Sequence, residues 1–451
     1  MIDPTPAYTR RRFLAVLAGA PTLVMATQLL DLSLAEDVDA AVTPPTTMEE
    51  ICDISELIVM GSAPTMPLVT LEVGTDGIAR LELPRIEMGQ GITTSVAMMI
   101  AEDLELPLEK VEVSLADARP ELMFNQMTAG SCTLRTFQKP LQGLAAGAKT
   151  RMMLAASQRW GVPLSAVTVE DGVVRGPGGQ SAGYGELAVE AKSVSLDGVT
   201  VTPKPLSEYR LIGTPTPRVD AREIVTGTKK FAMDLQTDKA KPAMVRRGPT
   251  VGAAPRSVNN ADAVKAMPGV RAVVAVPTGV AVVADTFGQA QDGVRALDVD
   301  FGPGPIDKES NETIIAELRK RMKPFDSPPP GARTVEVEFD FAGLTHAPME
   351  TECAVADVRP DGADLWAPFQ APILAQQAIA LDLGLPLDSV KAHVTKAGGG
   401  FGRRVFFDAP LEAARISKAA GMPVRLMWSR TEDIRHARSR PMQVHRFRAS
   451  V

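Results

Sequence analysis

Four short loops in this sequence combine small residues with side chains that form hydrogen bonds. They are EMGQG at 87–91, TAGSCT at 128–133, PFQAP at 368–372 and GGGFGRR at 398–404. Glycine lets a ligand approach the backbone closely, and a helix that begins after a loop offers unpaired N–H groups to an anion. A glutamine amide adds both donors and an acceptor. The loops therefore indicate a cofactor or phosphate site, and the alternative for the first and third is a tight turn that caps a helix.

The loop at 398–404 follows a predicted strand and contains four glycines and one aromatic residue. A cofactor can lie directly against such a backbone, beside the flat side chain of Phe401. The alternative is a glycine hinge, with Phe401 in the core and Arg403 and Arg404 in solvent. The glycine spacing differs from GxGxxG, which argues against a dinucleotide-binding fold.

Composition limits the classes of partner and metal. The chain has 451 residues, a formal net charge of −6 and only 4% aromatic residues, which argues against nucleic acid as a partner. Its three cysteines lie far apart without a C-x-x-C, so the chain cannot carry an iron–sulfur cluster or a structural zinc by itself. The four histidines show no metal-ligand spacing. We expect any metal to be held through an organic cofactor.

The first 35 residues are predicted to be a twin-arginine signal peptide. The basic run Arg10–Arg12 precedes an apolar stretch from Phe13 to Leu30, which is the order found in signal peptides. Ser33–Ala35 offers small residues for cleavage before Glu36. A buried N-terminal helix and an uncleaved membrane anchor are the alternatives. The twin-arginine pathway exports folded proteins, so we expect a periplasmic protein that receives its cofactor in the cytoplasm.

A helix, a proline-containing turn and a strand recur three times. The prolines are Pro107, Pro163 and Pro386, and each lies four residues before a valine that begins a predicted strand. Proline ends the helix, and the flanking apolar residues hold the turn against the core. Two of the helices, predicted at 92–104 and 373–383, directly follow the EMGQG and PFQAP loops. We interpret the repeats as duplicated α+β units packed around a shared cleft.

Proline- and glycine-rich breaks divide the chain into five parts. The predicted parts are the signal peptide at 1–35, a linker at 36–65, and domains at 66–206, 210–305 and 331–451. Further predicted elements are helices at 141–160 and 309–322 and strands at 270–276, 280–285, 334–341, 390–395 and 442–448.

With HAPME at 346–350, the EMGQG, PFQAP and GGGFGRR motifs resemble the large subunit of xanthine-oxidase-type molybdenum hydroxylases. EMGQG precedes the segment 210–302, as in the isoquinoline 1-oxidoreductase beta-subunit and aldehyde dehydrogenase branch. That segment is similar to the a/b hammerhead domain of the family, and the tail WSRTEDIRH at 428–436 also matches. The resemblance extends from Leu68 onward. It implies an α+β fold, with repeated helix–turn–strand units of a molybdopterin-binding domain plus an a/b hammerhead domain.

The resemblance implies a molybdenum-pyranopterin cofactor, as molybdopterin or its cytosine dinucleotide, held without any protein ligand to the metal. The first two loops would bind the pterin and its phosphate arm. Gln370, Phe401 and Gly402 would approach the ligands of the metal. The residues implied in cofactor binding are Gly89, Gln90, Gly91, Thr128, Gly130, Ser131, Gln370, Gly400, Phe401 and Gly402.

The implied activity is hydroxylation of N-heterocycles or aldehydes, with water as the oxygen source. The implied partners are a small subunit with 2Fe–2S clusters, a C-terminal half of the same subunit, a cytochrome c acceptor and a small-molecule substrate. The family's general base is a glutamate in a C-terminal Gly-x-Gly-Glu loop, which is expected beyond Val451; a general base contributes about 10²–10⁴-fold to rate. We therefore expect no catalytic residue in this chain, and no activity from it alone, whether it is an incomplete gene product, a fragment or half of a split subunit. A non-catalytic exported binding protein with the same folds is the alternative.

Overall fold

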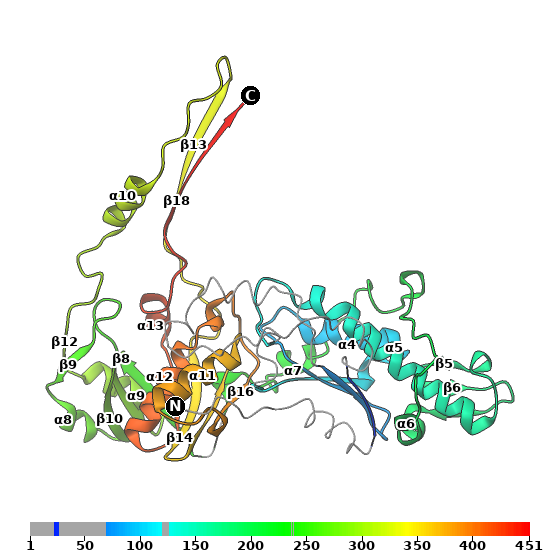
Figure 1. Cartoon of the computed structure of the whole chain (residues 1–451). Coiled ribbons are helices and arrows are strands. Elements are labelled where there is room, and N and C mark those ends of the chain that lie inside the picture. The colour runs from blue at the N-terminus through cyan, green and yellow to red at the C-terminus, as the bar shows by residue number, and fades with distance from the viewer. Residues whose placement is uncertain (1–21, 27–68, 120–125, 236, 238) are drawn as a thin grey trace. The chain divides into compact units, whose positions relative to one another are not determined.

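The computed structural model describes residues 22–26, 69–119, 126–235, 237 and 239–451 (Figure 1). These residues form two compact units, and neither unit is continuous in sequence. Unit 1 comprises the described residues up to Leu235, together with Asp361–Gly398 and Arg404–Phe407. Unit 2 comprises the described residues from 237 to Pro360, together with Gly399–Arg403 and Asp408–Val451. The predicted twin-arginine motif and the linker at 36–65 lie outside the described residues.

Unit 1 contains a four-stranded sheet with the strand order β1–β2–β3–β4. β1 pairs antiparallel with β2 and β2 with β3, whereas β3 and β4 are parallel. Buried residues alternate along β2 and β3, as expected for a sheet with one face in a core. β1 lies within the predicted signal-peptide segment, and its Leu23 and Met25 are fully buried. The strands of unit 1 are β1 (Leu23–Ala26), β2 (Thr70–Val73), β3 (Ala79–Leu83), β4 (Val111–Leu115), β5 (Thr168–Glu170), β6 (Val173–Arg175), β7 (Ser181–Gly183), β15 (Gly362–Ala367) and β16 (Val390–Val394).

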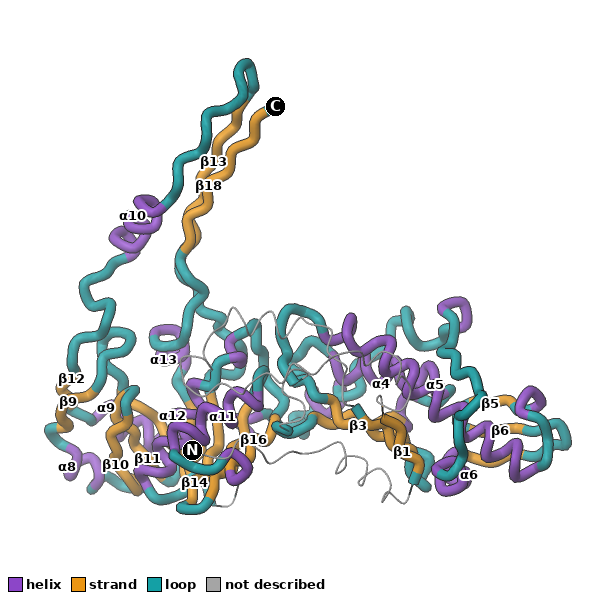
Figure 2. Tube along the Cα trace, viewed as in Figure 1, coloured by secondary structure: helices purple, strands orange, loops and turns teal. Residues whose placement is uncertain are grey.

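Two β–α–β units in unit 1 share one design, and Figure 2 distinguishes their strands from their helices. β3, α4 and β4 form the first, and β15, α11 and β16 form the second; in each, the helix connects two parallel strands. The EMGQG loop joins β3 to α4, and the PFQAP loop joins β15 to α11. Ligands of parallel α/β structures bind at this position, outside the carboxyl ends of the strands. The helices of unit 1 are α4 (Ile92–Leu104), α5 (Thr133–Trp160), α6 (Tyr184–Lys192), α7 (Ala221–Val225) and α11 (Pro372–Leu383).

The three predicted helix–turn–strand corners are confirmed. After Pro107, Pro163 and Pro386 the chain forms a short 3₁₀ turn and then enters a strand. At each corner the proline carbonyl accepts the N–H of the residue three positions on, at 3.0, 2.9 and 3.1 Å respectively. The repeated sequence therefore encodes one repeated backbone geometry.

Helix α5 begins earlier than the sequence predicts. It starts at Thr133 instead of at 141 and contains Pro140 in its interior. An interior proline costs a helix about 3 kcal/mol, which is why the sequence favours a later start. Phe137 and Leu141, on either side of Pro140, are fully buried, and their burial offsets this cost. As a result, the helix begins directly at the end of the TAGSCT loop.

Residues 204–229, which we call the strap, run alongside helix α4 in unit 1. Near the C-terminus of α4, the carboxylate of Glu102 accepts the backbone N–H groups of Arg210, Leu211 and Ile212 at 2.7–3.0 Å. At the other end of the helix, the hydroxyl of Thr94 accepts the N–H of Val219 at 3.1 Å. The domain boundary predicted near residue 210 thus differs from the division of the structure, which falls after Leu235. These long-range hydrogen bonds hold the start of the predicted hammerhead segment in unit 1.

Five of the strands of unit 2 are hydrogen-bonded to one another in the order β10–β11–β8–β17–β14. Helix α12 packs against β10, β14 and β17, and α9 packs against β8 and β11. The strands predicted at 270–276 and 334–341 have the predicted bounds. The strands of unit 2 are β8 (Lys241–Arg246), β9 (Pro255–Val258), β10 (Val270–Val276), β11 (Gly279–Ala284), β12 (Val299–Phe301), β13 (Thr334–Phe341), β14 (Cys353–Arg359), β17 (Val424–Met427) and β18 (Gln443–Ser450). Its helices are α8 (Ala261–Lys265), α9 (Phe287–Ala296), α10 (Asn311–Arg321), α12 (Asp408–Ala420) and α13 (Arg430–Arg435).

Both units mix helices with antiparallel and parallel strands, so the predicted α+β class is confirmed. Among the described residues, no helix combines the length and the apolar character needed to cross a membrane.

Candidate cofactor-binding site

Three of the four predicted loops meet in unit 1 through hydrogen bonds. Gln370 in the PFQAP loop donates from Nε2 to the carbonyl of Thr128 at 2.6 Å, and its own carbonyl accepts the N–H of Thr128 at 2.8 Å. The hydroxyl of Thr128 accepts the N–H of Ile86, directly before the EMGQG loop, at 3.0 Å. Ala397 N–H donates to the carbonyl of Glu87 at 2.9 Å, which brings the end of the β16 connection to the same place. Residues more than 240 positions apart in the sequence therefore form one cluster of loops.

His393 on β16 adds a second link between the two β–α–β units. Its Nδ1 lies 2.7 Å from a carboxylate oxygen of Asp117, which follows β4, and its Nε2 lies 2.9 Å from Asp364 on β15. The ring also stacks on Trp366, with 4.8 Å between the ring centroids. The hydrogen bond to Asp117 raises the pKa of His393; burial opposes this rise, and Asp364 adds to it.

We expect this link to weaken as the pH rises. Because the pKa of His393 is higher in the folded than in the unfolded chain, its contribution to stability is complete below about pH 6.5 and is lost as the pH rises through the folded pKa. Urea unfolding followed by tryptophan fluorescence at pH 6 and pH 9 tests this. Between these pH values the natural chain should lose about 1 kcal/mol more unfolding free energy than the His393→Gln variant. An equal pH dependence of the variant and the natural chain would exclude a charged His393 in this link.

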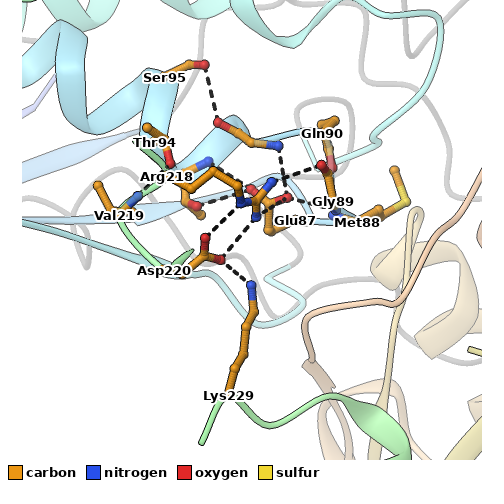
Figure 3. Close-up of polar contacts among 12 residues, drawn as sticks. Glu87, Met88, Gly89, Gln90, Thr94, Ser95, Arg218, Val219, Asp220 and Lys229 are labelled. Atoms are coloured by element: carbon orange, nitrogen blue, oxygen red, sulfur yellow. Dashed lines mark hydrogen bonds and ion pairs between the residues drawn. The ribbon is translucent and has the colours of Figure 1, made fainter. Parts of the chain in front are cut away.

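Glu87 organises the EMGQG loop (Figure 3). The side chain is 1% exposed, and its carboxylate accepts the N–H groups of Gly89, Gly91 and Thr93 at 2.8, 3.1 and 3.1 Å. Burial raises the pKa of Glu87, but the N–H donors of Thr93, Gly91 and Gly89 outweigh burial and hold the pKa below its ordinary value. The carboxylate therefore caps the N-terminus of α4. The N-terminus of α4 therefore matches the alternative interpretation of this loop, a tight turn that caps a helix. The first N–H groups of the helix already have an anionic partner.

Glu87→Gln should destabilise unit 1 by about 2–4 kcal/mol, because an amide has only one acceptor oxygen and turns its NH₂ toward backbone donors. Since the pKa of Glu87 is lowered by folding, the carboxylate stabilises the chain above about pH 4.3, and this stabilisation is lost as the pH falls through the folded pKa. Urea unfolding at pH 7 and pH 3 measures both effects. The exposed Glu109 is the control, and Glu109→Gln should change stability by less than about 0.5 kcal/mol.

Arg218 of the strap closes over the same loop (Figure 3). It donates from Nη1 to the carbonyl of Gly89 at 2.9 Å and lies 3.4 Å from the carboxylate of Glu87. Asp220 accepts from the same guanidinium at 2.9 and 3.1 Å and is itself bonded to Lys229. The sequence predicts neither Glu87 nor Arg218 as a site residue. An acidic residue that precedes a glycine-rich helix start is a signal for Glu87, whereas nothing local indicates Arg218.

The two predicted glutamines are partly used by their own loops. Gln90 accepts the N–H of Met88 at 2.6 Å and donates to the carbonyl of Ile86 at 2.9 Å. Gln370 accepts the N–H of Arg404 at 3.1 Å in addition to donating to Thr128. A primary amide carries two N–H groups, so each glutamine has one donor that these contacts do not use.

The backbone at two predicted glycines is open. Gly89 and Gly130 have φ values of +101° and +60°, and a side chain at either position would meet nothing within 4 Å. Gly130 and Ser131 precede α5, whose N-terminus has no side-chain cap and no acidic residue in its first turn. Arg85, 4% exposed, lies 4.7 Å above the ring of Phe137 in the first two turns of this helix. Burial lowers the pKa of Arg85 to about 10, so it stays charged at neutral pH and adds positive charge beside the helix end.

The GGGFGRR loop is divided, because Gly399–Arg403 belongs to unit 2 and its two end residues belong to unit 1. Phe401 is 63% exposed and has a φ of +56°, whereas Arg403 is fully buried. Arg403 lies 3.0 Å from Asp408, 3.5 Å from Glu352 and 5.8 Å from the centre of the Trp428 ring. The hinge alternative, with a core phenylalanine and solvated arginines, is therefore wrong. The buried arginine holds the loop, and the aromatic side chain is presented to solvent.

A side chain at two positions of this loop would affect its neighbours. A Cβ at Gly399, with a φ of +108°, would lie 3.0 Å from Pro348 of the HAPME motif. Gly402 has a φ of +93° and lies beside His346 of the same motif. Gly400 accepts the N–H of Arg403 at 2.8 Å and so closes the turn. The GGGFGRR and HAPME motifs are thus packed together in unit 2.

A Gly-x-Gly-Glu sequence occurs in unit 1, at Gly183–Glu186, far from the C-terminal position of the family motif. Glu186 is exposed at the start of α6 and accepts the N–H of Gly183 at 3.1 Å. Gly185 is required because a Cβ there would lie 2.3 Å from the carbonyl of Thr75. This glutamate is a helix cap and does not belong to the cluster of loops.

Two family models, both described as a molybdopterin cofactor-binding domain, match this sequence. One matches residues 51–224 and the other matches residues 330–451. All four predicted loops lie within the two matched regions. The class of the protein is therefore one built on molybdopterin cofactor-binding domains.

Curated relatives define the family further. The beta subunit of isoquinoline 1-oxidoreductase from Brevundimonas diminuta is 30% identical, over 86% of this chain and 57% of the relative. A nicotinate dehydrogenase subunit from Pseudomonas putida is 27% identical, over 86% of this chain and 34% of the relative. Membrane-bound aldehyde dehydrogenase (pyrroloquinoline-quinone) from Gluconacetobacter polyoxogenes is 26% identical, over 85% of this chain and 52% of the relative. The chain belongs to the xanthine oxidase family of molybdenum hydroxylases. It spans between about a third and somewhat over half of the length of these relatives.

The residues of unit 1 fit a phosphate-bearing organic cofactor. In the part of the chain that the structure describes, no group of three or more His, Cys, Asp or Glu side chains is arranged to hold a metal ion directly. What the loops offer instead is open backbone at Gly89 and Gly130, one amide donor each on Gln90 and Gln370, and a positively charged helix end beside Arg85. These are hydrogen-bonding groups suited to a pterin and to an anion.

Proposed function

We propose that this chain supplies cofactor-binding loops to the large subunit of an exported molybdenum hydroxylase that oxidises N-heterocycles or aldehydes. The observation that carries the proposal is the direct pairing of Thr128 with Gln370, which joins the TAGSCT loop to one β–α–β unit while Ile86 joins it to the other. A bound molybdenum–pterin group supplies a two-electron oxidation centre for hydroxylation with water as the oxygen source.

Within this proposal, each loop of unit 1 has a task that follows from its contacts. The free amide donors of Gln90 and Gln370 hold polar edges of the pterin. The phosphate arm lies at the N-terminus of α5, against Gly130 and Ser131, where the charge of Arg85 favours an anion. The N-terminus of α4 takes no part in anion binding, because Glu87 already caps it.

The proposal places the remaining parts of the enzyme on other polypeptide segments. Two relatives are named as single subunits of their enzymes, which supports assignment of this chain to a complex of several subunits. The chain has three cysteines without cluster spacing, so the 2Fe–2S clusters belong to a small subunit, with a cytochrome c as the acceptor. The general base, a glutamate in the family pattern, belongs to the part of the large subunit that this chain does not span.

Metal analysis of a reconstituted complex tests this function. The chain is coexpressed with a small 2Fe–2S subunit and with the segment of the Brevundimonas diminuta relative that lies outside the matched region. We expect about one molybdenum and one pterin per complex. Gly130→Val places a β-branched side chain at a φ of +60° and should lower the molybdenum content at least tenfold. A complex that assembles without molybdenum or pterin would show a binding protein that uses the same folds.

The export step of the proposal has its own test. Lysine in place of Arg10 and Arg11 should leave the protein in the cytoplasm, whereas Arg12→Lys should still allow export. Cell fractionation measures the difference. The mass of the exported protein also shows whether residues 1–35 are removed, which matters because Leu23 and Met25 are buried beside β2. Export of the variant that lacks both arginines would contradict the twin-arginine assignment.

A further inference from the structure

The two-stranded ribbon formed by β13 and β18 in unit 2 has two chemically different faces (Figure 1). Side chains alternate between the faces of a strand, and the antiparallel register places Val337 opposite Phe447 and Glu338 opposite Arg446. One face therefore carries only charged and polar residues over most of its length. The other, which we call the apolar ribbon face, consists of Val335, Val337, Phe339, Phe341, His445, Phe447 and Ala449, with Gln443 opposite Phe341 at one end.

The charged face of the ribbon already has its partners. Arg446 lies 3.0 Å from Glu338, and Arg448 lies 2.6 Å from Glu336 across the strands. Arg319 of α10 reaches Glu338 at 2.9 Å and also pairs with Asp340. The side chains of this face are thus satisfied within unit 2.

The apolar ribbon face remains open to solvent. Phe339, Phe341 and Phe447 are 49%, 51% and 55% exposed, and Val335 is 64% exposed. The rings of Phe339 and Phe447 contact each other edge to face, with 6.1 Å between their centroids, and Phe341 contacts the ring of His445 in the same way at 5.3 Å. An isolated two-stranded ribbon is marginally stable in water, and a contiguous apolar patch of this kind marks an interaction surface.

The size of the patch limits what can cover it. Eight residues in a pair of strands give a face of about 27 Å by 10 Å, or roughly 300 Å². A stable contact between two separate proteins buries about 800 Å² on each partner. A second copy of this chain, packed face to face on the ribbon alone, falls well short of that area. The occupant must be a polypeptide that continues onto other surfaces of the chain.

We propose that the apolar ribbon face is the docking surface for the part of the large subunit that this chain does not span. The ribbon lies inside the molybdopterin cofactor-binding match at 330–451, and this chain spans 57% of the isoquinoline relative. The proposal rests on the proposed function for the identity of the partner, but it requires neither molybdenum nor catalysis. The partner contributes an apolar surface over Phe339 and Phe447.

The test uses the full chain and a tagged probe, the segment of the Brevundimonas diminuta relative that lies outside the matched region. We expect the chain to copurify with the probe. Amide hydrogen exchange in 334–341 and 443–450 should be fast in the chain alone and should slow at least 100-fold in the complex. Phe339→Glu should weaken binding at least tenfold, because a buried aromatic anchor contributes strongly to an interface. Thr334→Glu, on the opposite face of the same strand, is the matched control and should change binding less than twofold.

Three results would overturn the proposal: failure of the natural chain to bind the probe, unchanged exchange of the ribbon in the complex, and slow exchange of the ribbon in the chain alone. A concentration-dependent dimer that Phe339→Glu abolishes would identify a second copy as the occupant instead. Circular dichroism of the variants controls for folding. A complex that forms through the ribbon but lacks molybdenum would support the docking surface and refute the proposed function, so the two failures are distinguishable.

Discussion

Replacing Glu412 by alanine should lower the free energy of unfolding of unit 2 by about 3–5 kcal/mol. Glu412, 1% exposed, forms a bidentate salt bridge with Arg247, with both N···O distances at 2.6 Å. It also accepts the indole N–H of Trp428 at 2.7 Å and the hydroxyl of Thr278. Without the carboxylate, Glu432 at 3.0 Å is the only carboxylate among the described residues that still forms an ion pair with the buried guanidinium of Arg247. The cost therefore comes mainly from a buried charge that has lost most of its compensation.

Urea unfolding measures this effect, and unit 2 supplies a matched control. Glu338 pairs with Arg446 on the solvent-exposed ribbon, so Glu338→Ala should cost less than about 1 kcal/mol. Methionine at both 247 and 412 should cost less than the sum of the single replacements, because no unpaired charge remains. Similar losses for Glu412→Ala and Glu338→Ala would show that burial does not set the strength of this pair.

The same cluster connects stability to the GGGFGRR loop. The guanidinium of Arg247 lies 3.9 Å from the centre of the Trp428 ring, which also faces Arg403 of the loop. Arg403 has no carboxylate with hydrogen-bonding geometry among the described residues, although Asp408 and Glu352 lie close enough for ion pairing. Loss of Glu412 should therefore also increase amide exchange at Gly399–Arg403.

Replacing Gln370 by alanine should reduce the molybdenum content of the reconstituted complex at least tenfold. The variant leaves the carbonyl of Thr128 and the N–H of Arg404 without the side-chain partners they have now, and Gln370 itself is 3% exposed. Each buried polar group left without a partner costs about 1–3 kcal/mol. The replacement therefore loosens the junction of the loops and also removes an amide donor from the proposed pterin site.

Gln376 on α11 is the matched control for this experiment. It is equally buried and donates from Nε2 to the carbonyl of Val390 at 2.6 Å, but this bond holds a helix–turn–strand corner and not the cluster of loops. Gln376→Ala should lower the stability of unit 1 by a similar amount and leave the molybdenum content of the folded complex unchanged. Equal molybdenum losses in the two variants would mean that Gln370 acts only through stability.

Features determined by neighbouring residues could be predicted from the sequence. Proline and valine at fixed spacing predict the three corners, because both act on the backbone within one turn. Alternating apolar and charged residues predict β13 with the observed bounds. The start of α5 was predicted wrongly, because the burial of Phe137 depends on residues distant in sequence. The family motifs supplied the class of cofactor, which local pattern alone does not give.

The contacts inside the candidate site could not be predicted from the sequence to the same extent. Thr128 and Gln370 were each predicted as cofactor residues, but their direct pairing depends on the fold of two distant segments. The same holds for Arg218, which reaches the carbonyl of Gly89 over 129 positions. Glu87 lies inside a recognised motif, and its position before a glycine-rich helix start is a signal for its role, but that its carboxylate accepts the N–H groups of Gly89 and Gly91 follows only from the folded loop.

The discontinuous composition of unit 1 has a consequence for how the chain matures. Its parallel pair β15–β16 and the Gln370 side chain come from Asp361–Gly398, after more than a hundred residues that belong to unit 2. A ribosome must therefore synthesise the chain at least as far as Gln370 before Thr128 can meet that residue, and closure of so long a loop is intrinsically slow. During that interval the TAGSCT and EMGQG loops lack the PFQAP loop as a partner and are accessible to chaperones and proteases. Early pausing or truncation of translation would thus yield a first half that has no completed junction to offer a cofactor.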